Sequence, residues 1–235
     1  MAAGRSDDAS GELQFQHNEA QRLKARVKAR LLGRPELAPR IGHFKLVRRL
    51  GQGASGVVYE AQDTRSGATL ALKLLRNPHA ANITRFKQEF RGLSHLSHEN
   101  LVQLHELYAD GDEWFFTMEL VRGLPFTEYV RGSARRSESC ELTGLRHALI
   151  ALCQAVQAVH DAGRLHCDLK PSNVLVTEAG RVVVLDFGLV TGLDEGSEVG
   201  SGVFGTPTYM APELSSSAAP TSATDAYAIG VMLSP

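Results

Sequence analysis

The chain has 235 residues, a length that suits one large domain or two small ones. Its 25 lysines and arginines nearly balance its 26 aspartates and glutamates, which argues against a dedicated nucleic-acid binder. The apolar fraction of 43% is enough for a buried core and argues against extended disorder. Three cysteines without a CxxC pair argue against a disulfide framework or a structural zinc site, so we expect a reducing, cytoplasmic location.

Residues 1–42 are expected to form an N-terminal extension with a basic amphipathic helix over residues 13–33. Residues 21–40 carry seven basic side chains and one acidic side chain, Glu36. Apolar residues recur there at helical spacing: Ala20, Leu23, Val27 and Leu31. Gly33 and Pro35 are expected to end the helix. One hypothesis is a helix that docks a partner or an anionic membrane; the favoured one lays the apolar stripe on the next domain, with the basic face in water.

The first residues lack the apolar core of a secretory signal, and no stretch approaches the ~18–20 apolar residues of a membrane span.

From residue 43 the pattern changes to that of strands. Five segments are predicted to form strands: 43–50, 57–63, 68–75, 101–108 and 113–120. One helix over 83–96 is expected among them, because Phe86, Phe90 and Leu93 fall on one face. The prediction is a five-stranded antiparallel sheet with one helix.

The second half of the chain is predicted to be mainly helical. A long helix with a buried face runs from Leu145 to Val159, with Thr143 as its N-cap and Gly163 as its stop. Residues 173–176 and 181–186 read as two short strands around a turn. A final helix is expected to begin near Ser222.

Three glycines between the first two strands, Gly51, Gly53 and Gly56, form a GxGxxG pattern. Alone this is a weak signal, since dinucleotide-binding folds also use it. Strands on both sides fit a flexible hairpin whose backbone N–H groups approach a phosphate. The alternative is an ordinary glycine-rich hairpin.

Other polar residues follow in an order that suits phosphate and metal chemistry. Lys73 lies on the third strand and Glu89 on the helix, and a buried lysine needs such a partner. The alternative for each is a solvated surface charge. Asp168 and Asn173 share one loop, and Asp186 ends an apolar strand; these groups suit a base and Mg²⁺ ligands. The alternative is that they form turns.

Together with the segment Gly205–Glu213, these motifs resemble the protein kinase family, specifically the bacterial eukaryotic-like (Hanks-type) serine/threonine kinases. The resemblance covers residues 43–235. It implies an α+β, two-lobed protein-kinase-like fold, with the sheet and helix in an N-lobe over 43–120 and a mainly helical C-lobe over 121–235. It also implies ATP- and Mg²⁺-dependent transfer of phosphate to serine or threonine hydroxyls of a protein substrate.

The resemblance assigns roles to individual residues. Lys73, paired with Glu89, holds the ATP phosphates, Asp168 accepts or orients the substrate hydroxyl proton, and Lys170 steadies the γ-phosphate. Asn173 and Asp186 hold Mg²⁺, and Thr206 and Glu213 belong to the activation segment and substrate platform. The implied ATP-binding residues are Leu50, Gly51, Gly53, Gly56, Val58, Ala71, Lys73, Met118, Glu119, Val121 and Leu175.

The chain departs from the family pattern in three places. Cys167 stands where the family has an arginine that pairs with a phosphate on the activation segment. No acidic residue stands at residues 124–125 for the ribose hydroxyls; Glu128 is the alternative, though not the favoured one. The chain stops inside the helix that contains Asp225, so we expect a truncated domain with an incomplete C-lobe. Truncation favours an alternative, a weakly active or non-catalytic ATP-binding pseudokinase or scaffold, whereas the retained catalytic residues favour the enzyme.

Overall fold

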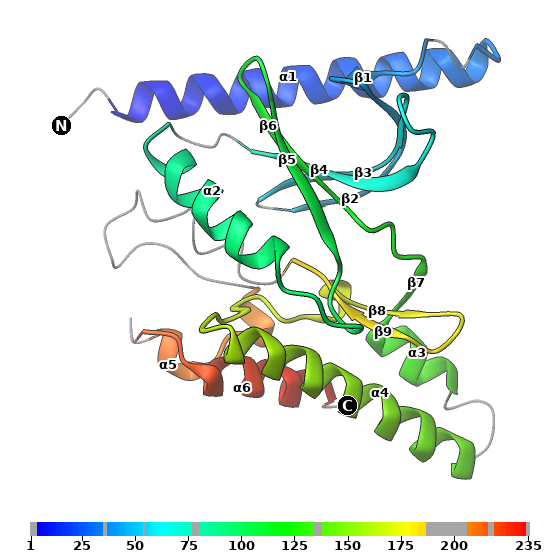
Figure 1. Ribbon diagram of the computed structural model, residues 1–235, viewed down its shortest axis with the longest axis vertical. Coiled ribbons are helices and arrows are strands. Elements are labelled where there is room, and N and C mark those ends of the chain that lie inside the picture. The colour runs from blue at the N-terminus through cyan, green and yellow to red at the C-terminus, as the bar shows by residue number, and fades with distance from the viewer. Residues whose placement is uncertain are drawn as a thin grey trace. The chain divides into compact units, whose positions relative to one another are not determined.

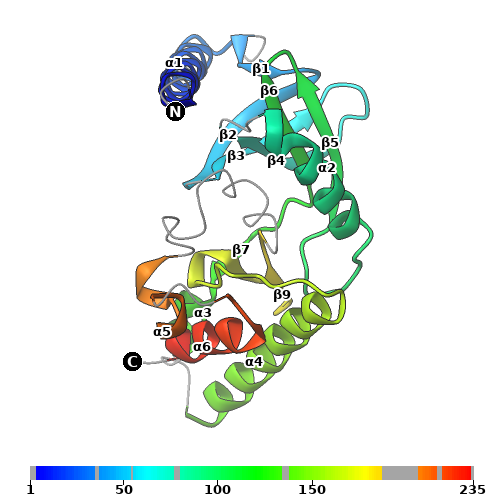
Figure 2. The same cartoon turned by 90° about the vertical axis from the view of Figure 1, so that its left-hand side faces the viewer.

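The computed structural model describes residues 4–34, 37–53, 55–76, 80–133, 138–186, 206–215 and 219–233 (Figures 1 and 2). The chain divides into two compact units. The first consists of residues 1–80 and 104–120, and the second of residues 81–103 and 121–235. None of the helices within these described ranges is long and apolar enough to cross a membrane.

The first unit contains an antiparallel six-stranded sheet with the order β1-β2-β3-β4-β6-β5. The five predicted strands are all present, as β2 (Phe44–Gly53), β3 (Gly56–Asp63), β4 (Thr69–Leu75), β5 (Leu104–Asp110) and β6 (Glu113–Met118). The sequence did not predict β1 (Arg40–Ile41), a two-residue edge strand that pairs with the start of β2. A strand this short has no alternation for a pattern to detect.

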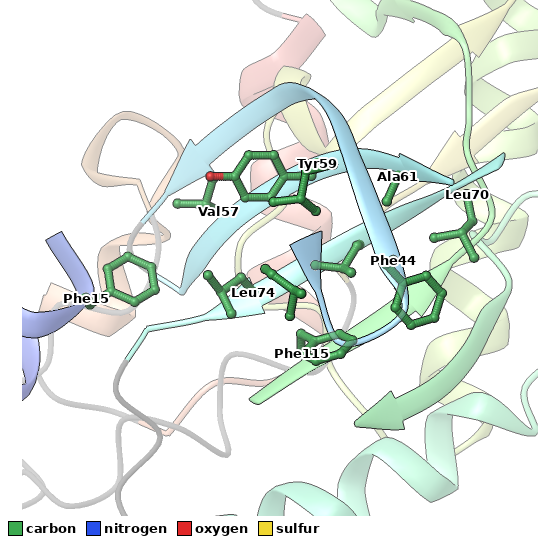
Figure 3. Packing of buried hydrophobic residues seen from close by; sticks show 11 residues of the cluster. Phe15, Phe44, Val57, Tyr59, Ala61, Leu70, Leu74 and Phe115 are labelled. Carbon is green, nitrogen blue, oxygen red and sulfur yellow. The ribbon is translucent and has the colours of Figure 1, made fainter. Parts of the chain in front are cut away.

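The apolar core of this unit covers one face of the sheet. Cross-strand pairing places Val57 opposite Leu74, Tyr59 opposite Leu72 and Leu74 opposite Phe115, so all five side chains share that face. They form one buried cluster with residues from β2, and Phe15 of the N-terminal helix joins it (Figure 3). The sheet alternation therefore leaves the opposite face to the residues between them, such as Val58 and Lys73.

The N-terminal helix α1 (Gly4–Leu31) lies along the sheet of the first unit (Figures 1 and 2). Gly33 follows it with φ of 61°, and the Arg34 N–H donates to the Ala29 carbonyl at 2.9 Å, which completes a Schellman motif. The prediction that Gly33 ends the helix is confirmed. The helix begins nine residues before the predicted residue 13, at Gly4.

The prediction that the apolar stripe of α1 packs on the next domain is wrong. Leu23 and Val27 are each 48% exposed and Leu31 is 79% exposed. The helix instead turns the face with Phe15 and Arg22 to the sheet, because these side chains find better partners there. Phe15 is buried beneath the Arg76 guanidinium, 5.4 Å from its ring centroid, and Arg22 forms an ion pair with Glu113 of β6.

The described residues from 121 onward, which belong to the second unit, are mainly helical, as predicted. The helices of the second unit are α2 (Ala80–Ser94), α3 (Phe126–Ser133), α4 (Glu138–Asp161), α5 (Pro212–Ser215) and α6 (Ser222–Leu233), and α2 takes its first residue from the first unit. The two predicted strands are present as β8 (Val174–Thr177) and β9 (Val182–Val184). A third strand, β7 (Gly123–Pro125), pairs with β8 and was not predicted.

The ends of α4 explain where the following loop begins. The helix starts at Glu138, so Thr143 lies within it and the predicted N-cap is wrong. The predicted stop at Gly163 is confirmed: its φ is 69°, and the Arg164 N–H donates to the Val159 carbonyl at 3.1 Å. The chain thus leaves the helix directly into residues 164–170.

Candidate active site

The glycine-rich hairpin joins β2 to β3, with Gly53 opposite Gly56. Gly56 has φ of 145°, and a Cβ atom built on it would lie 1.9 Å from the Leu74 carbonyl oxygen. Only glycine fits this position, because any side chain would collide with the backbone of β4. Gly51 lies opposite Val58 and has open space around it, so a Cβ atom there meets nothing within 4 Å.

The residues predicted to hold ATP in the first unit share the sheet face opposite the apolar cluster. Val58 lies opposite Lys73, and Ala71 lies opposite Met118. Gly51 pairs with Val58 on the same face. Lys73 is buried, with 3% exposure. Leu50 falls at an irregularity of the β2–β3 register, and Glu119 follows the end of β6. The regular strand pairing therefore brings together part of the predicted set: Gly51, Val58, Ala71, Lys73 and Met118.

Glu89, the predicted partner of Lys73, lies on α2 in the second unit. It is 5% exposed, which is unusual for a glutamate. Because the two residues belong to different units, their pairing stays a prediction.

Residues 166–173 form a compact polar loop around Asp168. The Lys170 Nζ atom lies 2.6 Å from Oδ2 of Asp168 and donates to Oγ1 of Thr206 at 3.0 Å. The Asn173 amide donates to the Asp168 carbonyl oxygen at 2.8 Å. The Thr206 hydroxyl donates to the other carboxylate oxygen of Asp168 at 3.3 Å. Three predicted site residues, Lys170, Asn173 and Thr206, therefore surround the Asp168 carboxylate, and Lys170 places a positive charge beside it.

The two predicted metal ligands are connected through the backbone. The Leu185 N–H donates to the Asn173 carbonyl at 2.8 Å, and the Leu185 carbonyl accepts from Nε2 of His166 at 2.9 Å. Asp186 is the next residue, with φ of 56°. The Asn173 amide nitrogen already donates to Asp168, so its Oδ1 oxygen points the other way. A carboxylate and an amide oxygen are hard ligands that fit Mg²⁺.

The buried carboxylate of Asp225, in α6, anchors the start of this loop. It accepts the backbone N–H groups of His166 and Cys167, each at 2.9 Å, and its Oδ2 atom lies 2.8 Å from Nε2 of His160. Cys167 has φ of 63°, a strained conformation for a residue with a side chain. The carboxylate stabilises this conformation by satisfying two buried donors.

The electrostatic environment of this loop keeps two side chains neutral. Burial lowers the pKa of His166, against the opposing effects of Asp225 and Asp168. The bond from the Asp168 N–H to Nδ1 of His166, at 3.3 Å, is consistent with the neutral ring. Burial, followed by the Asp225 and Asp168 carboxylates, raises the pKa of the Cys167 thiol to about 12. The position of the family's arginine is thus occupied by an uncharged thiol.

The remaining predicted residues are placed singly. Leu175 lies on β8 opposite Pro125 and Val183, and Val121 precedes β7. Glu213 in α5 accepts a hydrogen bond from the Thr224 hydroxyl of α6 at 3.2 Å. Residues 187–205 of the predicted activation segment lie outside the described residues.

Sequence reasoning missed the structural roles of Asp225 and His160. The sequence places Asp225 in the last helix and predicts no partner for it. The signal was an aspartate in a helix otherwise rich in apolar residues, since such a group is buried only with partners. For His160, in the last turn of α4, the sequence carries no comparable signal.

Comparison with known proteins gives a consistent result. The profile of the family described as "Protein kinase domain" matches residues 44–234. The serine/threonine-protein kinase PknA of Mycobacterium tuberculosis H37Rv is 33% identical over 213 residues, which cover 83% of this chain and 48% of PknA. Pkn1 of Myxococcus xanthus, also a serine/threonine-protein kinase, is 34% identical over 207 residues, covering 84% of this chain and 29% of Pkn1. The chain thus spans about half or less of these relatives.

Proposed function

Because the chain belongs to the protein kinase family, we propose that it transfers the γ-phosphate of ATP to serine or threonine hydroxyls of a protein substrate, with Mg²⁺. One observation carries this proposal: the Asp168 carboxylate with Lys170, Asn173 and Thr206 within hydrogen-bonding distance. The names of the relatives, which are serine/threonine-protein kinases, support the hydroxyl class.

The chemistry requires positioning more than covalent catalysis. Asp168 would orient the acceptor hydroxyl and take its proton, and the ammonium of Lys170, 2.6 Å away, would neutralise charge that develops on the phosphate. Asn173 and Asp186 would hold Mg²⁺, which neutralises phosphate charge when bound. The hydrogen bonds of Leu185 support this pairing. The Leu185 backbone bonds to both Asn173 and His166, and Asp186 is the next residue in the chain.

We propose that Lys73 holds the phosphates with Glu89 as its partner, and that Gly51, Gly53 and Gly56 cover them. The adenine would contact Val58, Ala71, Met118 and the backbone of Glu119 and Val121, with Leu50 and Leu175 as further apolar contacts. The register of β2, β3, β4 and β6 supports the first-unit part of this set, because it places its members on one face of the sheet.

A non-catalytic ATP-binding or scaffold module is the competing function. Both functions predict Mg-ATP binding, so the experiment must separate binding from transfer. We expect the wild type and Asp168→Asn to bind Mg-ATP with similar affinity in calorimetry, because Asp168 acts on the acceptor hydroxyl. Only the wild type should transfer radiolabel to a protein acceptor. Equal transfer by both proteins, or none by either, would contradict the catalytic assignment.

We propose a cytoplasmic setting for this activity, which the cysteine pattern supports.

We also propose that the partner of α1 is a negatively charged helix of another protein. Helix α1 exposes Leu23, Val27 and Leu31, and Lys24 and Lys28 beside them are exposed as well. This narrow stripe lacks aromatic residues and suits a helical seam better than a lipid surface.

The partner proposal is tested with a designed acidic amphipathic peptide and with vesicles that contain phosphatidylserine. The peptide should bind the full chain, and the double change Leu23→Gln with Val27→Gln should abolish binding. Cosedimentation with the vesicles and no peptide binding would overturn the assignment in favour of a membrane.

A further inference from the structure

A pocket of about 120 Å³ lies between α1 and the β2–β3 hairpin, within the first unit and on the sheet face opposite the predicted ATP-binding residues. Three arginines line it: Arg22 and Arg26 from α1, and Arg49 from β2. Tyr59, the cross-strand partner of Arg49, also lines it. None of these pocket residues has a role in the phosphate transfer proposed above.

The carboxylates near this pocket are already engaged. Glu19 lies 2.9 Å from the Arg22 guanidinium and accepts the hydroxyl of Tyr59. Glu113 of β6 forms an ion pair with Arg22 and accepts a hydrogen bond from Asn18 at 3.2 Å. Burial raises the pKa of Tyr59 and keeps its hydroxyl a neutral donor. Arg22 is therefore neutralised by two acidic groups.

Unlike Arg22, the side chains of Arg26 and Arg49 are not neutralised by an acidic group of the described residues. Within the described ranges, neither has a carboxylate partner; Arg49 donates to the side-chain amide oxygen of Gln52 at 3.0 Å. Three guanidinium groups thus face two carboxylates, which leaves an excess of one positive charge in a concave site. Such a site favours an anion, because a guanidinium without a carboxylate partner can form charge-assisted hydrogen bonds with one.

We propose that this pocket binds a phosphate monoester group, held by Arg26 from the helix and Arg49 from the sheet. A phosphate carries a charge of about −1.5 to −2 and three acceptor oxygens, so it can serve two guanidinium forks at once. A carboxylate offers two oxygens and one charge. The apolar wall formed by Ala20, Leu23 and Pro39 suits the carbon that carries the ester.

The size of the pocket limits the ligand. Sites for whole drug-sized molecules enclose about 300–1,000 Å³, so this one takes a phosphorylated group and not a complete nucleotide. The group can come from a phosphorylated side chain or from free phosphate. In either case the ligand would bridge α1 and β2. A ligand that binds the folded state and not the unfolded state raises the melting temperature of the protein.

The experiment measures binding to the full chain by calorimetry and thermal melting. The probes are a phosphothreonine peptide, the same peptide without phosphate, and sodium phosphate against sodium chloride at equal ionic strength. The variants are Arg26→Gln and Arg49→Gln. The matched control is Arg30→Gln, which removes the same charge from an exposed position of α1 that does not line the pocket.

We expect saturable phosphate binding with a rise in melting temperature. Arg26→Gln and Arg49→Gln should each weaken binding by about tenfold or more, as loss of a charge-assisted contact does, and Arg30→Gln by less than about twofold. Tighter binding of the phosphothreonine peptide identifies a phosphorylated side chain as the source, and tighter binding of free phosphate identifies the ion. No saturable binding by either probe, undiminished affinity in the pocket variants, or an equal loss in Arg30→Gln would overturn the proposal.

Discussion

The Oδ1 atom of Asp225 accepts a hydrogen bond of 2.9 Å from the backbone N–H of Cys167. The two residues are 58 positions apart, and this bond joins α6 to the loop that carries Asp168. Cys167 and Asp186 are the non-glycine residues with positive φ in the part of the chain that the structure describes. A buried carboxylate thus supports a strained backbone one residue before the proposed catalytic aspartate.

Replacing Asp225 by alanine should destabilise the protein by about 3–5 kcal/mol, because it leaves buried N–H groups of His166 and Cys167 without an acceptor. Chemical denaturation measures this change. The matched control is Asp161→Ala, which removes an exposed carboxylate at the end of α4 and should cost less than about 0.5 kcal/mol. Similar values for the two variants would contradict the anchoring role.

Gly56→Ala should cost about 2–4 kcal/mol, because its φ of 145° is strained for alanine and the new Cβ would collide with the Leu74 carbonyl. Gly51→Ala is the control in the same hairpin, where a Cβ atom meets nothing within 4 Å, and should cost less than about 1 kcal/mol. Thermal melting of both variants tests this difference. Equal losses would mean that the hairpin relaxes around residue 56.

Stability should fall as the pH decreases below about 6.5, with a contribution from His166. Its pKa is lowered in the folded state by burial, so in acid the unfolded chain takes up a proton that the folded chain excludes. This contribution is present above the ordinary histidine pKa and declines below it, by up to about 1.4 kcal/mol per pH unit.

The check on this pH dependence is the free energy of unfolding between pH 5 and 8. His166→Gln should flatten the acid limb, and His147→Gln, at an exposed position of α4, should not. An identical slope in the wild type and His166→Gln would disprove the neutral, buried state.

Activity should depend little on phosphorylation of residues 187–209. Cys167 replaces the arginine that would receive such a phosphate, and its pKa of about 12 keeps the thiol uncharged. Treatment with a phosphatase should change the initial rate of phosphate transfer by less than about threefold, because a phosphate without a cationic partner orders no loop. A tenfold drop would show that another cation takes over that role.

Lys73→Met and Asp186→Asn should each lower the rate of phosphate transfer by at least about 10²-fold, since each removes a group proposed to act on phosphate charge or Mg²⁺. Circular dichroism should show a retained fold. An unchanged rate in either folded variant would contradict its assigned role.

Strand positions and site motifs could be predicted from the sequence because both are local. Short apolar segments between glycine-containing turns predicted β3 and β4, and Gly163, with its positive φ, follows the end of α4 as predicted. The orientation of α1 could not be predicted from the sequence. A periodic pattern identifies an apolar stripe on a helix, but it does not show which face of the helix is buried. Phe15 and Arg22 lie on the docked face, and their partners Arg76 and Glu113 are 61 and 91 residues away.

The loop around Asp168 shows the same limit. Its motif identified the residues, but the bonds that hold it come from Thr206 and Asp225, which are 38 and 57 positions further along the chain. The pocket between α1 and β2 also depends on a long-range pairing that no local pattern contains.

The central claim is that Asp168 acts in phosphate transfer to protein hydroxyls. The most direct measurement is transfer from γ-labelled ATP with Mg²⁺ to a protein acceptor, followed by phosphoamino acid analysis, for the wild type and Asp168→Asn. We expect labelled phosphoserine or phosphothreonine from the wild type, and a rate at least about 10²-fold lower from the variant. Equal labelling by the two proteins, or label found only on tyrosine, would contradict it.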